Sequence, residues 1–174
     1  MGKDRLADIS LKNIAITDGF WNKYRNLVKD VIIPYQWDTL NDNVPDAEPS
    51  HCIENFRIAA GEKNGEFYGA VFQDTDVAKW LEAVAYVLDS QGRDEELEKL
   101  ADETIDLIGK AQGSDGYLNT YFTIKEPERR WTNLREGHEL YTVGHMIEAA
   151  VAYYQATGKR KFLDIVMRFA DLIS

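Results

Sequence analysis

Apolar residues recur at helical spacing from residue 137 to about residue 157, and Gly158 follows them. One stripe of the predicted helix is apolar and consists of Leu140, Val143, Ile147, Ala150, Val151 and Tyr154. The opposite stripe consists of His138, Tyr141, Thr142, His145, Ala149 and Ala152. Only Glu139 and Glu148 add charge, at the flanks. Because a helix with so few charges is typical of a protein interior, we expect it to be buried on most sides.

The same periodicity predicts helices over most of the remaining chain. They are expected at 18–31, 51–60, 74–90 and 159–174, with another beginning at Asp94 and a short turn at 35–40. Asp18 is an expected N-cap, as is either Asp74 or Thr75, and Pro34 is expected to break the first helix. A short strand is expected at 9–17 and a longer loop at 119–136.

The sequence contains an internal repeat, in which corresponding residues are separated by the same number of positions. Leu81-Glu82-Ala83 corresponds to Ile147-Glu148-Ala149, and Gly92 corresponds to Gly158. Each unit is a mostly apolar helix, a glycine turn and a charged amphipathic helix. Stacked hairpins bury one another's apolar faces, so the repeat predicts an all-α array with 76–89 and 139–156 as inner helices. About three hairpins fit, half of a closed (α/α)6 barrel or toroid, and more are expected beyond the last residue.

In such an array the loops before the inner helices share one rim. Gln73, Asp74 and His138 lie in these loops, Tyr117 lies in a preceding turn, and His145 continues the polar face of the later helix. Polar groups and aromatic rings gathered on a rim predict a sugar-binding cleft, because rings stack on sugar faces and carboxylates accept hydrogen bonds from hydroxyls. The competing explanations are helix capping by Asp74, loop packing by Tyr117, and core histidines with backbone partners.

The two histidines do not form a metal pair. They lie two helical turns apart in sequence, which is about 10 Å along a helix at about 1.5 Å per residue. Metal–ligand bonds are about 2 Å long, so both side chains cannot bind one ion. Cys52, the single cysteine, is expected to be a buried inert thiol, and a reactive pair with His51 is the alternative. The residue pattern therefore predicts no metal site in this chain.

Composition limits the class of partner. The chain has 174 residues, enough for one domain with a substantial core, and its formal net charge is −10. That charge argues against nucleic acid and against an anionic membrane surface. The sequence contains no apolar run long enough to span a membrane, and its N-terminus lacks the apolar segment of a secretory signal. With one cysteine and no internal disulfide, these features favour a cytoplasmic protein.

Five motifs, in order along the chain, resemble glycoside hydrolase family 127, which comprises β-L-arabinofuranosidases and their relatives. The motifs are Ile33-Pro34-Tyr35-Gln36-Trp37, Asn55-Phe56-Arg57-Ile58-Ala59-Ala60-Gly61, residues 71–82, Ser114-Asp115-Gly116-Tyr117-Leu118, and His138-Glu139-Leu140-Tyr141 with Gly144-His145. The resemblance spans essentially the whole chain. It implies an (α/α)6 barrel followed by β-sandwich domains, with residues 1–174 as the N-terminal portion of the catalytic barrel.

The resemblance also implies a function: a retaining hydrolase that releases terminal L-arabinofuranose. Its nucleophile would be a cysteine thiolate held by zinc, and a separate glutamate would be the acid/base. These residues belong to the later part of the family's barrel, and Cys52 is not in the nucleophile's motif. His138 corresponds to a sugar-contacting histidine, and Gln73 and Asp74 match a rim motif. We therefore expect no catalytic residue and no cofactor in this chain, and zinc only in the full-length protein.

Two other functions are compatible with the pattern. One is a non-catalytic helical-repeat scaffold that binds a protein, and the other is a different α/α-barrel sugar enzyme, such as an epimerase. A scaffold should have a short regular repeat, whereas this chain has a long repeat unit and long polar-aromatic loops. On the glycosidase interpretation, the isolated chain should be inactive, and its uncovered apolar faces should favour a homodimer or aggregation.

Overall fold

In the computed structural model, which describes residues 11–174, every regular element is a helix. The long helices are α1 (Gly19–Leu27), α2 (Ile33–Leu40), α3 (Cys52–Ala59), α4 (Asp74–Gln91), α5 (Glu95–Ala111), α7 (Glu139–Thr157) and α8 (Lys161–Ile173). The short elements are η1 (Leu11–Asn13), η2 (Val28–Ile32), α6 (Thr120–Ile124) and η3 (Pro127–Arg129). The predicted all-α class is confirmed for the described residues.

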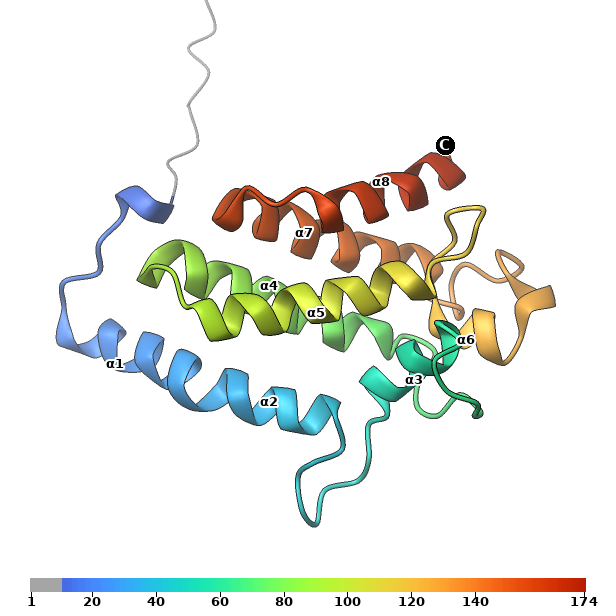
Figure 1. Ribbon diagram of the computed structural model, residues 1–174, viewed down its shortest axis with the longest axis horizontal. Coiled ribbons are helices and arrows are strands. Elements are labelled where there is room, and N and C mark those ends of the chain that lie inside the picture. Colours follow the sequence, from blue (N-terminus) through green and yellow to red (C-terminus); the bar gives the residue numbers. More distant parts are fainter. Residues whose placement is uncertain (1–10) are drawn as a thin grey trace, which may run out of the picture.

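The internal repeat is confirmed as two stacked hairpins. α4 and α5 form the first hairpin, and α7 and α8 form the second. α5 begins at Glu95 and α8 at Lys161, which is the same offset that separates Gly92 from Gly158. In Figure 1, α4 and α7 lie side by side and run in the same direction, and their contact is the most extensive between any two helices. These are the two predicted inner helices, and the arrangement is that of part of an (α/α)6 barrel.

The first helix differs from the prediction. Pro34 does not break it, since α1, η2 and α2 follow one another without interruption from Gly19 to Leu40. A proline has no N–H to donate, and its ring clashes with the carbonyl four residues earlier, which is that of Asp30. η2, a π-helical segment, contains Asp30 and widens the helix at that point, so the chain passes the proline as a helix. Asp18 is the N-cap as predicted and accepts a hydrogen bond from the N–H of Trp21 at 2.8 Å.

Two other local predictions are wrong. Of the strand expected at 9–17, residues 9 and 10 lie outside the described part, η1 is a 3-10 helix, and the remaining residues are irregular. The loop expected at 119–136 contains α6, because the Asn119 side chain caps that helix and accepts a hydrogen bond from the N–H of Phe122 at 3.1 Å. A buried polar cap of this kind makes a single helical turn stable inside a loop.

α7 buries only part of its predicted apolar stripe. Leu140, Val151 and Tyr154 of that stripe are exposed, Val143 and Ala150 are buried, and the neighbouring Thr142, Met146, Ala149 and Tyr153 are buried as well. α4 makes the most extensive contact with α7, and small side chains such as Thr142 and Ala149 let two helix backbones approach closely. The expectation that α7 is buried on most sides is therefore wrong for the described residues, and part of its apolar stripe faces outward.

The core of the molecule lies between these layers. α5 and α8 turn their apolar faces inward, with Ile105, Ile108, Val166 and Phe169 buried, and their charged residues outward. α2 covers another side of α4, where the indole N–H of Trp80 donates to the carbonyl of Ile33 at 3.1 Å. Within residues 11–174, every helix is too short or too polar to cross a membrane.

Candidate functional site

The N-terminal ends of α4 and α7 lie at the same end of the molecule, beside α3 and α6 (Figure 1). The rings of Phe72 and His138 meet there edge to face, with their centroids 5.2 Å apart. His138 has a left-handed backbone (φ 51°) and directly precedes α7, and its side chain is partly exposed. The shared rim predicted for the two inner helices is therefore confirmed, with His138 on it.

A row of polar and aromatic side chains leads from this rim along α7. The ring of Tyr141 lies 5.9 Å from that of His138 and 4.6 Å from that of His145. From α4, the ammonium of Lys79 donates a hydrogen bond to the Tyr141 hydroxyl at 3.2 Å. The sequence pattern predicted the two histidines on one face, but Lys79 belongs to another helix and could not be placed beside them.

A cavity of about 420 Å³ opens between α2 and α4, on the other side of Lys79. Its lining is Tyr35, Gln36, Thr39, Leu40, Ser50, Cys52, Asp76, Lys79, Trp80 and Ala83. Hydroxyl, carboxylate and ammonium groups together with an exposed aromatic ring are the groups that can bind a polyhydroxylated ligand. Sequence reasoning missed this cavity, although Tyr35 and Lys79 both lie in motifs that were singled out.

Both polar groups of the Gln73 side chain form hydrogen bonds within the protein. Its amide nitrogen donates to the Cys52 sulfur at 3.1 Å, and its amide oxygen accepts from the N–H of Ala70 at 3.1 Å. Cys52 is buried, and burial raises the pKa of its thiol to about 11, although the Gln73 hydrogen bond acts in the opposite direction. The buried inert thiol expected for Cys52 fits this environment, because a protonated thiol is a poor nucleophile.

Asp74 is buried and does not cap α4. Its carboxylate accepts two hydrogen bonds from Thr120, one from the backbone N–H at 2.7 Å and one from the hydroxyl at 2.5 Å. Burial raises the pKa of this carboxyl to about 6, against the lowering effect of the two hydrogen bonds. Asp74 therefore ties the start of α4 to α6, and the expectation that it caps α4 is wrong.

Tyr117 is also buried. Its hydroxyl donates to one oxygen of Glu139 at 2.5 Å, and the N–H of Trp131 donates to the other oxygen at 2.8 Å. The Arg130 guanidinium lies 4.0 Å from the centroid of the Tyr117 ring. Burial, followed by the bond to Glu139, raises the pKa of the Tyr117 hydroxyl. This network fixes the long loop against the first turn of α7 and so positions His138.

Side chains of metal-binding type also come together in this molecule. In the described part of the chain, one group of His, Cys, Asp and Glu side chains is close enough to hold an ion, and it consists of Glu82, His145 and Glu148. Cys52, the one thiol, is not in it and contacts Gln73 and Ser50 instead. A zinc–thiolate centre of the kind that the resemblance implies is therefore not formed by these residues.

The helical hairpins, with two inner helices that share a rim, define part of an α/α-barrel protein. The family description "Beta-L-arabinofuranosidase, GH127 catalytic domain" matches residues 13–174, and this chain belongs to that family. The resemblance read from the five motifs is thereby confirmed.

Individual relatives agree with this assignment. A non-reducing end β-L-arabinofuranosidase of Bifidobacterium longum subsp. longum is 42% identical over 92% of this chain and 27% of its own length. The crystal structure of a GH127 β-L-arabinofuranosidase from Geobacillus stearothermophilus T6 is 67% identical, with a TM-score of 0.91 over 92% of this chain and 25% of that one. A further GH127 β-arabinofuranosidase structure is 35% identical, with a TM-score of 0.84 over 95% and 26%. The chain thus spans about a quarter of the length of these relatives.

Proposed function

We propose that this chain supplies part of the sugar pocket of a glycoside hydrolase that releases terminal L-arabinofuranose from β-L-arabinofuranosides. The observation that carries the proposal is the partly exposed His138 on the rim shared by α4 and α7, in a chain of the GH127 family. An imidazole can donate and accept hydrogen bonds to sugar hydroxyls, and the adjacent Phe72 ring offers an apolar face.

The other predicted site residues have different parts in this proposal. Gln73, Asp74 and Tyr117 act as positioning residues, because their polar groups are engaged with Cys52, Thr120 and Glu139. Asp76 and Lys79, which line the cavity and lie 3.9 Å apart, are the additional groups available to sugar hydroxyls. The contact surface proposed here is therefore His138, Phe72 and the cavity between α2 and α4.

We also propose that residues 1–174 form the N-terminal portion of a catalytic (α/α)6 barrel. The support is the outward-facing apolar side of α7, where Leu140, Val151 and Tyr154 are exposed on a helix that belongs to the inner layer. A neighbouring hairpin of the same barrel would cover these side chains in the way that α4 covers the opposite face. Zinc and the catalytic cysteine and glutamates of the whole enzyme stay predictions for residues outside this chain.

Three further statements stay predictions. A homodimer is expected from the exposed apolar side chains, a cytoplasmic location from the single cysteine, and neither a nucleic acid nor a membrane is an expected partner. An epimerase would have the same fold class as the proposed glycosidase, and only its reaction product would differ. The scaffold alternative predicts no turnover at all.

A chimeric enzyme tests the proposed function. Residues 13–174 replace the aligned segment of the Geobacillus stearothermophilus enzyme, and turnover of a chromogenic β-L-arabinofuranoside is measured with identification of the sugar released. We expect a folded chimera that releases L-arabinose. A chimera that folds but releases no sugar would contradict the proposal, and a rearranged, unhydrolysed sugar would favour the epimerase.

A further inference from the structure

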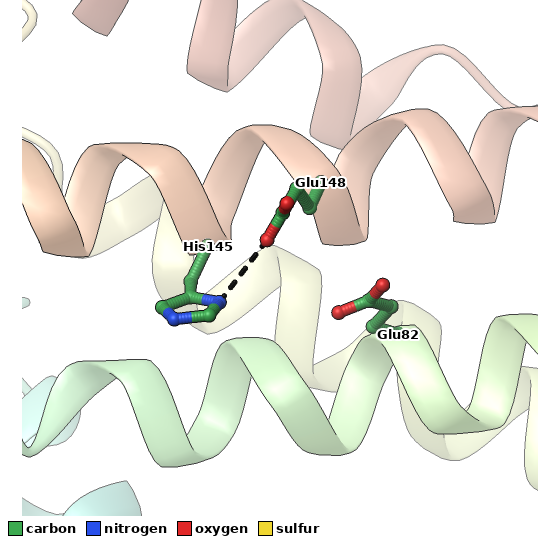
Figure 2. A group of neighbouring side chains, drawn as sticks. All are labelled: Glu82, His145 and Glu148. Atoms are coloured by element: carbon green, nitrogen blue, oxygen red, sulfur yellow. Dashed lines mark ion pairs between the residues drawn. The ribbon is translucent and has the colours of Figure 1, made fainter.

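Three side chains of types that can ligate metal ions converge between α4 and α7 (Figure 2). Glu82 extends from α4 toward α7, and His145 and Glu148 extend from α7 toward α4. One ligand atom from each of the three side chains lies within 4.8 Å of the other two. The cluster lies about two helical turns along α7 from His138, away from the rim residues.

The repeat explains how the two carboxylates come together. Glu82 and Glu148 occupy equivalent positions of the repeat, in Leu81-Glu82-Ala83 and Ile147-Glu148-Ala149. Because α4 and α7 run side by side in the same direction, equivalent positions are brought to the same level of the array. His145, one turn before Glu148, then adds an imidazole from the same side of α7.

The His145 imidazole is held in place by a neighbouring ring, and one of its nitrogens makes no hydrogen bond. The Tyr141 ring packs edge to face on His145, with centroids 4.6 Å apart and planes at 89°. His145 Nδ1 is inaccessible to solvent and lies 3.2 Å from a Glu148 oxygen, but the two are not aligned as a hydrogen bond. A buried ring nitrogen without an aligned hydrogen bond is costly, and a metal ion would satisfy it.

The two carboxylates are not neutralised by a Lys or Arg side chain of the described residues. Within residues 11–174, neither Glu82 nor Glu148 forms an ion pair with a Lys or Arg side chain, and Glu148 has only His145. The Tyr86 hydroxyl donates to one oxygen of Glu82 at 2.8 Å, which orients that carboxylate and leaves its other oxygen available. A hydrogen bond of this kind is typical of the partners that orient metal ligands.

We propose that Glu82, His145 and Glu148 bind one divalent transition-metal ion, for which zinc is the best match. One imidazole with two carboxylates is a donor set that zinc accepts at bond lengths of about 2 Å, and tetrahedral ligand atoms then lie about 3.3 Å apart. The His145–Glu148 separation of 3.2 Å already has that value, and a Glu82 ligand atom lies within 4.8 Å of the group. Three protein ligands leave one position for water, and the ion joins the two inner helices.

This site differs from the zinc centre that the family resemblance implies. That centre needs cysteine thiolates, and the one thiol of this chain is hydrogen-bonded to Gln73 and lies outside the cluster. The proposal also does not depend on the sugar-binding role of His138. Failure of the metal-site proposal can therefore be told apart from failure of the proposed sugar-binding role of His138.

Zinc titration of the untagged, metal-free 174-residue chain tests the proposal. We expect one zinc per chain by calorimetry and by metal analysis after dialysis, and a higher thermal unfolding temperature with zinc than with chelator. Glu82→Gln, Glu148→Gln and His145→Gln should each weaken binding about tenfold or more, since even partners outside the metal shell are worth about 10- to 100-fold. The controls are His51→Gln and Glu54→Gln, because His51 pairs with Asp42 and Glu54 with Lys63.

The outcomes are distinguishable. Zinc-dependent shifts of the His145 ring nitrogens in NMR spectra, lost in Glu82→Gln, would support the site without reference to activity. Helical circular dichroism shows whether each variant is folded, and Glu82 and Glu148 are accessible enough for glutamine to be accommodated. Absence of binding to the folded wild type would overturn the proposal. Equal binding by wild type and all three variants would identify the zinc as adventitious only, which would also overturn it.

Discussion

Buried carboxylates hold the rim together. Asp74 receives both of its hydrogen bonds from Thr120, and Glu139 receives one from Tyr117. Each carboxylate fastens the first turn of an inner helix to a loop from another part of the chain. Because an unsatisfied buried carboxylate is very costly, these contacts specify one position for each loop, and His138 is placed as a consequence.

The raised pKa of Asp74 predicts a pH dependence of stability. The folded-state pKa is about 6 and the ordinary value is 3.8, so between these values the folded state binds more protons than the unfolded state. The free energy of unfolding contributed by this group therefore falls as pH rises from about 4 to about 6, by roughly 3 kcal/mol at most. Urea unfolding of wild type and Asp74→Asn at a series of pH values measures the difference.

In that comparison, Asp74→Asn is expected to gain stability relative to wild type as the pH rises, because asparagine carries no titratable group. Thr120→Val serves as a second variant, since it removes the hydroxyl bond and should raise the carboxyl pKa further. Parallel stability curves for wild type and Asp74→Asn would mean that Asp74 titrates normally in the folded protein.

The sequence predicted some of these residues and not others, for a physical reason. His138 could be placed on a rim because a helix start and a repeat are local and periodic signals. The pairing of Asp74 with Thr120, or of Glu82 in α4 with His145 in α7, depends on how two distant segments pack, and no local pattern encodes it. The expectation of no metal site rested on the spacing of His138 and His145 and on the single thiol of Cys52, and neither reveals which side chains of another helix lie nearby.

At the scale of whole elements, the repeat and the cap at Asp18 were predictable, whereas the cap of α4 and the packing faces were not. Asp18 and Asp94 cap their helices through the N–H groups of Trp21 and Leu97, as their types and positions indicate. By contrast, α7 buries Thr142 and Met146 while Leu140 and Val151 of its apolar stripe are exposed, and α4 is the helix it contacts most. The apolar stripe alone could not reveal which face has a partner among the described residues.

Two glycines provide a prediction at this scale. Gly144 lies inside α7 with nothing within 4 Å of an added Cβ, so Gly144→Ala should stabilise the protein by roughly 0.5–1 kcal/mol. Gly116 has φ +93°, and an added Cβ would lie 2.5 Å from the carbonyl oxygen of Arg168 in α8. Gly116→Ala should therefore destabilise by roughly 1–3 kcal/mol. Chemical denaturation measures both changes, and equal effects of the same sign would contradict this description of the turn and the helix.

At the scale of the whole molecule, α4 and α7 form an inner layer with α5 and α8 outside it, and none of residues 11–174 covers the outward apolar side of α7. Exposed apolar side chains gathered on one surface promote association. Sedimentation is therefore expected to give an average mass above the 19.9 kDa of one chain, increasing with protein concentration. The exposed residues Leu140 and Val151 belong to this surface.

Charged substitutions test which surface associates. Leu140→Glu and Val151→Glu should shift the protein toward the monomer without lowering its unfolding temperature, because both side chains are already exposed. Leu134→Glu, at an equally exposed leucine in the loop before α7, is the matched control and should leave association unchanged. A wild-type chain that remains monomeric at every concentration would refute the prediction.

The central claim is that the rim at His138 forms part of a sugar pocket, and His138 variants of the chimera with the Geobacillus stearothermophilus enzyme test it most directly. His138→Ala removes the ring, and His138→Phe keeps a ring against Phe72 but removes its hydrogen-bonding nitrogens. If the imidazole binds the sugar, both variants should lower kcat/KM for the β-L-arabinofuranoside about tenfold or more, with thermal unfolding temperatures close to that of the unsubstituted chimera. Unchanged kcat/KM in a folded His138→Phe chimera would contradict the account.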